Sequence, residues 1–207
     1  MASKYVFWGE DSFVSLTELE RLEIVHCLLS TIDLGAFNGL TQLTRLIITA
    51  NYVSEIIPGT FENMINLEYL QLVDNKIKHV DRDMFSGLFT LKYIYLSKNQ
   101  LQYLHPDAFV RLQNLKMLYL NNNPDIQIPT ERNFIKSLSL PHLDISRCNV
   151  SSLSVETFPK VSALGMLDLR YNKLKTVDIN ISKALLKLSS LYLYGNPLQC
   201  DCQLQEV

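Results

Sequence analysis

The sequence predicts a repeat solenoid of the α/β type, built from short parallel strands, and three observations predict it. Phenylalanines recur every 24 residues along most of the chain, with one interval of 25. Leucines keep the same interval, in segments of the form L-x-x-L-x-L-x-x-N-x-L. An asparagine or a cysteine holds the N position of each segment. A fixed period of this length is typical of a solenoid in which each repeat is one turn.

Each segment contains one short strand, because the L-x-L alternation places successive side chains on opposite faces. The leucines of the alternation point into the solenoid together with the phenylalanine column, which comprises Phe13, Phe37, Phe61, Phe85, Phe109, Phe134 and Phe158. The segments begin at Leu19, Leu43, Leu67, Leu91, Leu115, Leu140, Leu164 and Leu188. The sequence therefore predicts about eight strands, stacked side by side.

The asparagine column has a chemical reason. A carboxamide offers two donors and an acceptor, which satisfy backbone groups where the chain turns away from the strand. The column comprises Asn51, Asn75, Asn99, Asn123, Asn172 and Asn196, with Cys27 and Cys148 in the same position of their repeats. Cysteine suits this position because it is small, is readily buried and has a weak S–H donor. We expect no disulfide between the two cysteines, since five strand-to-strand spacings of about 4.8 Å separate them.

Composition narrows the class of protein. The chain has 207 residues, of which 47% are hydrophobic, and a formal net charge of −2. These values indicate one well-packed domain and give no electrostatic reason to expect a nucleic acid partner or an anionic membrane surface. No apolar run approaches the ~20 residues that span a bilayer, and the N-terminus lacks the apolar core of a signal peptide.

The repeat resembles the leucine-rich repeat family, in its type of about 24 residues with a phenylalanine spine, which is common in extracellular animal proteins. Toll-like receptors, Slit-type guidance proteins and variable lymphocyte receptors share these features. The resemblance implies a solenoid with leucine-rich repeats over residues 19–195. Residues 1–18 are then a partial preceding repeat, and the abrupt start of the chain suggests that Met1-Ala2-Ser3 were added for expression. Residues 196–207 are the start of a cysteine-rich C-terminal cap.

Both ends of the chain suggest a fragment of a longer solenoid. In the family, the cap cysteines that match Cys200 and Cys202 bond to partners further along, and this chain stops before them. Solenoids need caps to protect their terminal cores. We therefore expect the exposed ends to be covered by self-association or by the Tyr5–Trp8 segment.

The family's fold places the strands on the concave side of an arc, opposite an irregular convex side. Three columns of side chains then project from the sheet. The first is Arg21, Arg45, Tyr69, Tyr93, Met117, His142, Met166 and Ser190; the second is Glu23, Ile47, Gln71, Tyr95, Tyr119, Asp144, Asp168 and Tyr192; the third is Val25, Thr49, Val73, Ser97, Asn121, Ser146, Arg170 and Tyr194.

The central repeats place an uncharged, tyrosine-rich patch on these columns, with charged residues on both sides. Tyrosine is favoured as an interface anchor because it offers a large contact area with a polar tip. Tyrosine also has high strand propensity, so stabilisation of the sheet alone remains an alternative. We predict that ligand is held by Tyr69, Gln71, Tyr93, Tyr95, Met117, Tyr119, Asn121, His142, Asp144, Asp168, Arg170, Tyr192 and Tyr194.

Catalysis is not expected on this surface. His142, Asp144 and Ser146 alternate along one strand, about 7 Å apart, which exceeds the reach of a base and its nucleophile. Asp144 and Asp168 with His142 could hold a metal ion, but we expect Arg147 and Arg170 to be their charge partners instead. The sequence therefore predicts no enzyme activity and no cofactor.

Three remaining features concern the outer surface. Asn149 and Asn180 begin N-x-S triplets and would carry glycans in a secreted protein. The long repeat contains PDIQIPTERN between Asn123 and Phe134. We expect this segment to bulge, because its two prolines disfavour a regular helix, and a lateral contact is its candidate role. Lys173, Lys175, Lys183 and Lys187 are expected on a solvated outer surface.

The sequence therefore predicts a recognition module of a secreted or cell-surface protein, which holds a protein or glycan ligand on the concave face. The resemblance to Toll-like and lymphocyte receptors implies innate immune recognition. The alternative is an adhesion or guidance ectodomain that binds another cell-surface protein. A passive spacer without a selective partner is the third possibility.

Overall fold

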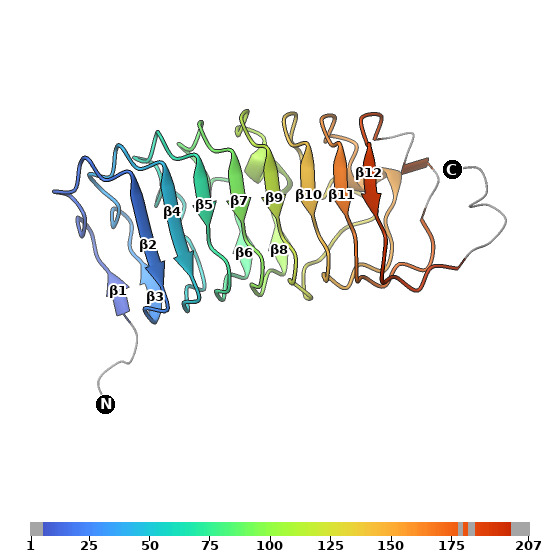
Figure 1. The fold of residues 1–207 in the computed structure, drawn as a ribbon, viewed down its shortest axis with the longest axis horizontal. Helices are drawn as coiled ribbons and strands as arrows, with labels where there is room; N and C mark the ends of the chain where they lie inside the picture. The colour runs from blue at the N-terminus through green and yellow to red at the C-terminus, as the bar shows by residue number, and fades with distance from the viewer. Residues whose placement is uncertain (1–5, 178–179, 182–184, 200–207) are drawn as a thin grey trace.

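The computed structural model describes residues 6–177, 180–181 and 185–199. Its main element is a parallel sheet of eight strands in the order β2-β4-β5-β7-β9-β10-β11-β12, which run side by side along the solenoid (Figure 1). The strands are β2 (Arg21–Val25), β4 (Arg45–Thr49), β5 (Tyr69–Gln71), β7 (Tyr93–Tyr95), β9 (Met117–Tyr119), β10 (His142–Asp144), β11 (Met166–Asp168) and β12 (Ser190–Tyr192). The predicted fold class and number of strands are confirmed.

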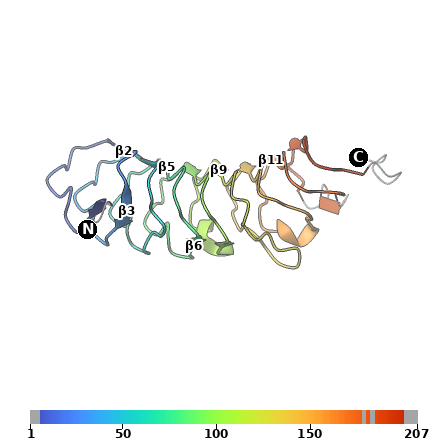
Figure 2. The same ribbon diagram turned by 90° about the horizontal axis from the view of Figure 1, so that it is seen from below.

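Shorter elements lie on the side of the solenoid opposite the sheet (Figure 2). Two small parallel sheets pair β1 (Val6–Trp8) with β3 (Leu29–Ile32), and β6 (His79–Val80) with β8 (Tyr103–Leu104). Two 3₁₀ helices follow, η1 (Pro106–Phe109) and η2 (Val155–Thr157). Apart from the helical residues 180–181, the described part of this side is otherwise made of turns and irregular backbone, as predicted.

The core fills the space between the two sides. The middle residues of the strands, such as Leu70, Ile94 and Leu118, are completely buried. Phenylalanines of consecutive turns stack behind them: the ring centroids of Phe37 and Phe61 lie 6.1 Å apart. One repeat cannot enclose such side chains alone, so each turn depends on its neighbours for burial.

The asparagine ladder forms as predicted. Asn99 is typical of it: its side-chain oxygen accepts a hydrogen bond from the Ile77 backbone N–H at 3.1 Å. Its side-chain nitrogen donates to the carbonyl oxygens of Leu72 at 2.9 Å and of Leu96 at 3.0 Å. Each ladder residue thus connects its own turn to the preceding one and satisfies backbone groups that are buried at the turn.

Cys148 and Cys27 occupy ladder positions and are both free thiols, as expected. Cys148 is buried, and its thiol donates to the Leu120 carbonyl of the preceding strand at 3.3 Å. The expectation that Cys27 is buried too is wrong, because its side chain is exposed. Within the described residues, no strand of the large sheet precedes β2, so Cys27 has no neighbouring strand of that sheet on its N-terminal side.

The N-terminal end of the core is covered by the chain's own first described strand. The Asp33 backbone N–H donates to the Trp8 carbonyl at 3.1 Å, and β1 lies beside β3. The Trp8 ring packs edge-on against Phe13, with centroids 5.0 Å apart. This supports the expectation that the Tyr5–Trp8 segment protects this end, although Tyr5 itself lies outside the described residues. Cys200 and Cys202 also lie outside them, so the cap remains a prediction.

Candidate ligand-binding surface

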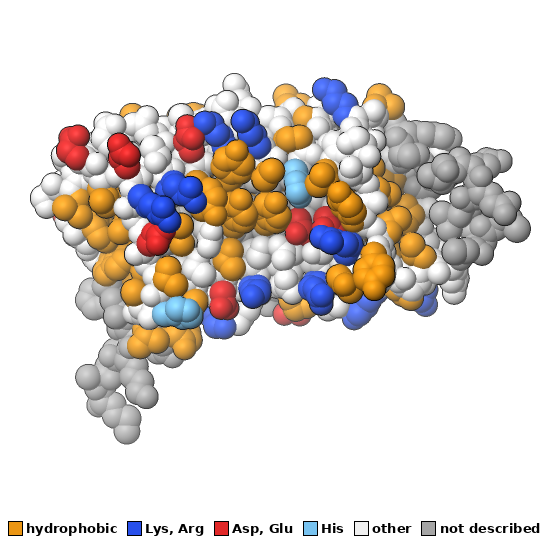
Figure 3. All heavy atoms as spheres, viewed as in Figure 1, with side chains coloured by type: hydrophobic (Ala, Val, Ile, Leu, Met, Phe, Trp, Pro, Cys, Tyr) orange, Lys and Arg blue, Asp and Glu red, His pale blue; other side chains and the backbone are white. Residues whose placement is uncertain are grey.

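The strand register brings the predicted columns together residue by residue. Tyr69, Tyr93 and Met117 are partners across neighbouring strands, and so are the second-column residues Tyr95 and Tyr119. We call the exposed side of the eight-stranded sheet the sheet face. Apolar side chains gather at its centre, and charged ones lie on either side of them (Figure 3). The register pairs the first and second columns along the whole sheet, and the third column only at Val25 and Thr49.

Aromatic rings form a continuous row across the central strands. Tyr69 lies 5.0 Å from Tyr95 between ring centroids, and Tyr95 lies 4.8 Å from Tyr119 with the rings only 6° from parallel. Tyr119 in turn lies 5.2 Å from His142. Tyr93 joins the row at 6.1 Å from Tyr69. We call Tyr69, Tyr93, Tyr95, Tyr119 and His142 the aromatic row.

The aromatic row is half-buried and held by hydrogen bonds at its edges. The Tyr69 hydroxyl donates to the Gln71 side-chain oxygen at 2.6 Å, and the Gln71 amide donates to the Thr49 hydroxyl at 3.0 Å. The Tyr119 hydroxyl lies 3.8 Å from the Met117 sulfur. These contacts fix the ring positions before any ligand arrives, so binding there would lose little side-chain entropy.

Burial among other rings alters the acidity of two of the tyrosines. Burial, followed by the neighbouring Tyr69 and Tyr119, raises the pKa of Tyr95 to about 12. Burial also raises the pKa of Tyr119, and the nearby carboxylates of Asp144 and Asp168 raise it further. Both hydroxyls are therefore neutral at physiological pH and act as hydrogen-bond donors or acceptors.

Arg45 extends the row in a way that we did not predict. Its guanidinium lies 4.2 Å from the centre of the Tyr69 ring, in a cation–π contact. We expected Arg45 only as a flanking charge. This contact could have been predicted from the sequence, because Arg45 and Tyr69 share the first column and neighbouring strands are close enough for such stacking.

Two aspartates lie side by side beyond the other end of the row. Asp144 and Asp168 are partners in the register of β10 and β11, and both side chains are buried. The Arg170 guanidinium binds the Asp168 carboxylate through two nitrogens, at 2.6 and 2.9 Å, as expected. This pairing raises the pKa of Arg170.

Asp144 has a different environment. Burial raises the pKa of its carboxyl group, and hydrogen bonds from Ser146 oppose that shift. The expected pairing with Arg147 is wrong, because the Arg147 guanidinium lies 4.1 Å from the centre of the Tyr171 ring instead. Arg147 lies at the turn after the strand and has a positive φ of 56°. Its side chain therefore does not continue the alternation of the strand and does not project beside Asp144.

The arrangement of His142, Asp144 and Ser146 also differs from the expectation in one detail. Asp144 and Ser146 are not out of reach of each other, since the carboxylate accepts the Ser146 backbone N–H at 2.8 Å. His142 forms no hydrogen bond with either residue in the described part of the chain. Nor do the described residues contain a cluster of three or more metal-ligating side chains.

The remaining predicted site residues lie at the margins. Asn121 accepts a hydrogen bond from Ser97 at the loop edge of the sheet. Tyr192, on β12, lies under the Arg170 guanidinium at 5.5 Å. Tyr194 is well exposed and packs edge-on against Tyr171 rather than against the aromatic row. The structure therefore separates Tyr194 from the central patch.

The predicted glycosylation residues are both on the surface. Asn149 is exposed, and its side-chain nitrogen donates to the Pro124 carbonyl at 3.0 Å. Asn180 is also exposed. Of the predicted outer lysines, Lys173, Lys175 and Lys187 are exposed, and Lys183 lies outside the described residues. No helix in the described part of the chain has the length and apolar character of a membrane span.

Three solved structures are similar to this chain. The TLR13–ssRNA13 complex has a TM-score of 0.59 and 25% sequence identity, over 94% of this chain and 36% of the other. The Drosophila Toll–Spatzle complex has a TM-score of 0.68 and 20% identity, over 90% and 28% of the two chains. The APL1 leucine-rich repeat domain has a TM-score of 0.56 and 18% identity, over 93% and 60%. This chain thus spans between 28% and 60% of the length of these structures.

The comparison with TLR13 bears on one expectation. The near-neutral charge suggested no nucleic acid partner, whereas a similar structure is a complex with RNA. The charge argument therefore does not exclude nucleic acid for this fold. No curated protein sequence matches the chain.

The family is shown by the repeats themselves. The leucine-rich repeat family model matches residues 17–77, 41–101, 65–124 and 139–198, which together cover most of the chain. The matched ranges contain all eight strands of the large sheet. The chain belongs to the leucine-rich repeat family.

Proposed function

We propose that this chain is a recognition module of a secreted or cell-surface receptor, and that it holds a protein ligand on its sheet face. The observation that carries the proposal is the aromatic row, a set of pre-ordered rings at the centre of a surface with charges around it. Interfaces commonly combine aromatic anchors at the centre with a polar rim. The leucine-rich repeat fold is typically a non-enzymatic binding scaffold, which agrees with this role.

The charges divide the sheet face into two unlike ends. Arg45 lies at one end of the aromatic row, with the Arg21–Glu23 ion pair beyond it. Asp144 lies beyond the other end, beside the Asp168–Arg170 ion pair. A ligand with an apolar centre and opposite charges at its two ends would be held in one orientation. Such complementarity gives specificity and speeds association more than it increases affinity.

Innate immune recognition is the first role that we propose for this module. The support is its likeness to the TLR13–ssRNA13 and Toll–Spatzle structures. An extracellular location follows from the same likeness. In the alternative role, adhesion or guidance, the same surface binds another protein of the same organism. A glycan is the alternative class of ligand.

The test compares surface variants of the intact chain against panels of purified microbial surface proteins and host ectodomains. A double variant, Tyr95→Ala with Tyr119→Ala, removes two central rings. Phe89→Ala is the matched control, since Phe89 is an exposed aromatic residue outside the predicted columns of the sheet face. We expect the double variant to lose more than ~2 kcal/mol of binding free energy, or about thirtyfold in Kd, for the captured partner.

Surface plasmon resonance and thermal unfolding distinguish the outcomes. A folded double variant that binds as tightly as the unaltered chain would contradict the role of the aromatic row and leave sheet stabilisation as its only effect. Partners from the microbial panel alone would support immune recognition. Partners from the host panel alone would support adhesion.

A further inference from the structure

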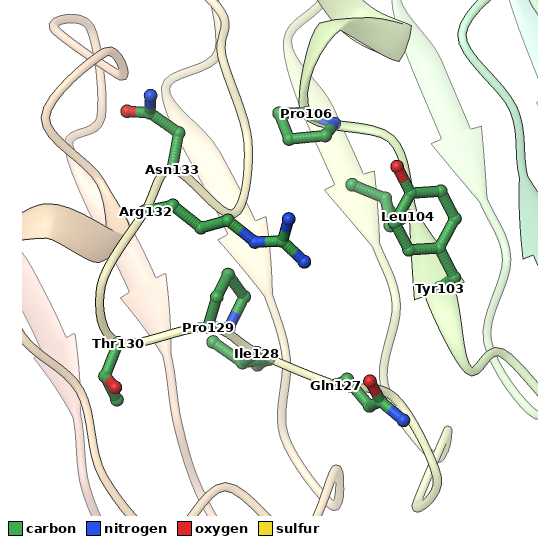
Figure 4. A pocket seen from close by; sticks show the side chains of 9 residues that line it. All are labelled: Tyr103, Leu104, Pro106, Gln127, Ile128, Pro129, Thr130, Arg132 and Asn133. Atoms are coloured by element: carbon green, nitrogen blue, oxygen red, sulfur yellow. The ribbon is translucent and has the colours of Figure 1, made fainter.

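A cavity of about 400 Å³ lies on the opposite side of the solenoid from the sheet face, where the repeat of 25 residues departs from the others. Its walls come from two neighbouring turns: Tyr103, Leu104 and Pro106 on one side, and residues 127–130, 132 and 133 on the other (Figure 4). The volume is within the ~300–1,000 Å³ that small-molecule sites usually have.

The cavity exists because a proline interrupts the pairing between turns. In the preceding pair, the backbone N–H groups of Tyr103 and His105 donate to Lys78 and Val80, at 3.4 and 2.8 Å. One turn later, Gln127 repeats the first of these bonds by donating to Gln102 at 3.0 Å. Pro129 stands where the second donor should be, 24 positions after His105, and it has no N–H.

Beyond Pro129 the segment turns toward the following repeat. The Pro129 carbonyl accepts the Thr157 hydroxyl at 3.2 Å, and the Thr130 carbonyl accepts the Ser154 hydroxyl. Pairing with the preceding turn resumes only where the Lys136 N–H donates to the Pro106 carbonyl at 2.9 Å. The detached stretch is thus held away from Leu104 by bonds to the next repeat, which keeps the cavity open.

A cation without a partner lies in this cavity. The Arg132 guanidinium extends from the detached stretch into the space facing Leu104 and Tyr103 (Figure 4). Among the described residues it has no ion pair and no hydrogen bond, although Arg82 and Lys136 nearby both pair with Asp107. A guanidinium presents a planar fork of donors that matches a carboxylate.

The other lining groups are a mixture of polar and apolar. Leu104, Pro106 and Ile128 provide apolar wall, and Tyr103 adds a ring that is one-third or more exposed. The side-chain oxygen of Asn133 is buried without a hydrogen-bond partner. Protein atoms enclose this oxygen, so it does not face the cavity.

We propose that this cavity binds one acidic sugar residue, with its carboxylate on Arg132 and its ring against Tyr103. A sugar supplies a carboxylate for the guanidinium, hydroxyl donors for the amide oxygen of Gln127, and an apolar ring face for the aromatic wall. An aspartate or glutamate side chain supplies the carboxylate but no side-chain donors. The site is separate from the sheet face and does not depend on the proposed function.

The experiment titrates the intact, ¹⁵N-labelled chain at low salt with three probes. These are methyl β-glucuronide, methyl β-glucoside as its uncharged counterpart, and N-acetylglutamate amide as the peptide counterpart. We expect saturable shifts of the backbone amide signals of residues 127–128 and 130–133 with the glucuronide. Arg132→Gln should weaken this binding at least about tenfold, since hydrogen bonds to a charged group contribute ~1.5–3 kcal/mol.

Arg111→Gln is the matched control, because Arg111 is also an exposed arginine without an ion pair in the described residues, and it lies outside this cavity. It should bind the glucuronide as the unaltered chain does. Equal binding of the glucoside, unchanged binding by Arg132→Gln, or shifts with the peptide counterpart alone would each overturn the proposal. So would the absence of saturable shifts with the glucuronide.

Discussion

Tyr95 and Tyr119 stack with their ring centroids 4.8 Å apart and their planes 6° from parallel, although a complete turn of the solenoid separates them along the chain. The contact arises from the parallel register, in which the two residues are direct partners on β7 and β9. It belongs both to the stability of the sheet and to the proposed binding surface. Experiments must therefore separate the two contributions.

A double-mutant cycle measures the first contribution. Tyr95→Ala and Tyr119→Ala should show a coupling of about 0.5–1.5 kcal/mol in the free energy of unfolding, as aromatic pairs do. Chemical denaturation of the four proteins gives this value. The pair Tyr95→Ala with Phe89→Ala should be additive, because Phe89 is not among the rings that contact Tyr95. Full additivity at Tyr95 and Tyr119 would contradict a stabilising stack.

Alkaline pH should weaken the fold through Tyr95. Its pKa is about 12 in the folded chain, above the ordinary value of 10.0. The folded state therefore holds this proton more tightly than the unfolded state. The resulting stability is fully present below pH 10 and is lost as the pH rises toward 12. Denaturation at several pH values should show this loss, and Tyr95→Phe should lose less across the same window.

Asp144→Asn should stabilise the fold at neutral pH. Burial raises the folded-state pKa of the Asp144 carboxyl. The stability that the neutral carboxyl group contributes is therefore fully present below the pKa that Asp144 has in the unfolded chain. It declines as the pH rises through the pKa that Asp144 has in the folded chain. An amide keeps the acceptor for the Ser146 N–H without the buried charge. We expect a higher Tm than the unaltered chain at pH 7 and a smaller difference at pH 3; a lower Tm at pH 7 would show that the charge itself stabilises the sheet.

Asn99→Ala should be among the most destabilising single changes. It removes an acceptor for Ile77 and a donor to Leu72 and Leu96, all buried. Each unsatisfied buried group costs about 1–3 kcal/mol, so a loss of about 3 kcal/mol or more is expected in denaturant unfolding. Asn99→Cys should be milder, because Cys148 fills the same position of another repeat. Asn114→Ala is the control, since its one bond, to Phe89, is exposed.

The two described thiols should react at very different rates. Cys27 is exposed, whereas Cys148 is buried and its pKa is raised by that burial to about 12. Reaction requires the thiolate and access to it. In a Cys200→Ser, Cys202→Ser background, peptide mapping after maleimide treatment should find Cys27 labelled at once and Cys148 only in denaturant. Rapid labelling of Cys148 in the native chain would indicate local opening of the ladder.

Much of this molecule was predictable because its contacts are between equivalent positions. Once the repeat length is known, the neighbour of Tyr95 across the sheet has to be Tyr119, and the neighbour of Asp144 has to be Asp168. The Asp168–Arg170 pair followed from the same alternation. Prediction from the sequence failed where a residue does not follow this pattern of equivalent contacts. The Arg147 side chain lies against Tyr171, and Cys27 follows the edge strand of the large sheet, which has no preceding neighbour among the described residues.

By itself the sequence determined the period, the strands, the buried columns and the order of residues on the sheet face, because a one-dimensional array converts spacing directly into position. Only the tertiary structure decided how far side chains reach between turns. Arg45 lies over Tyr69, and the cavity beside Arg132 opens where Pro129 cannot donate a hydrogen bond and the chain bonds to the following repeat instead. Such choices depend on competition between neighbouring turns for the same hydrogen-bonding groups, which the spacing of residues alone does not specify.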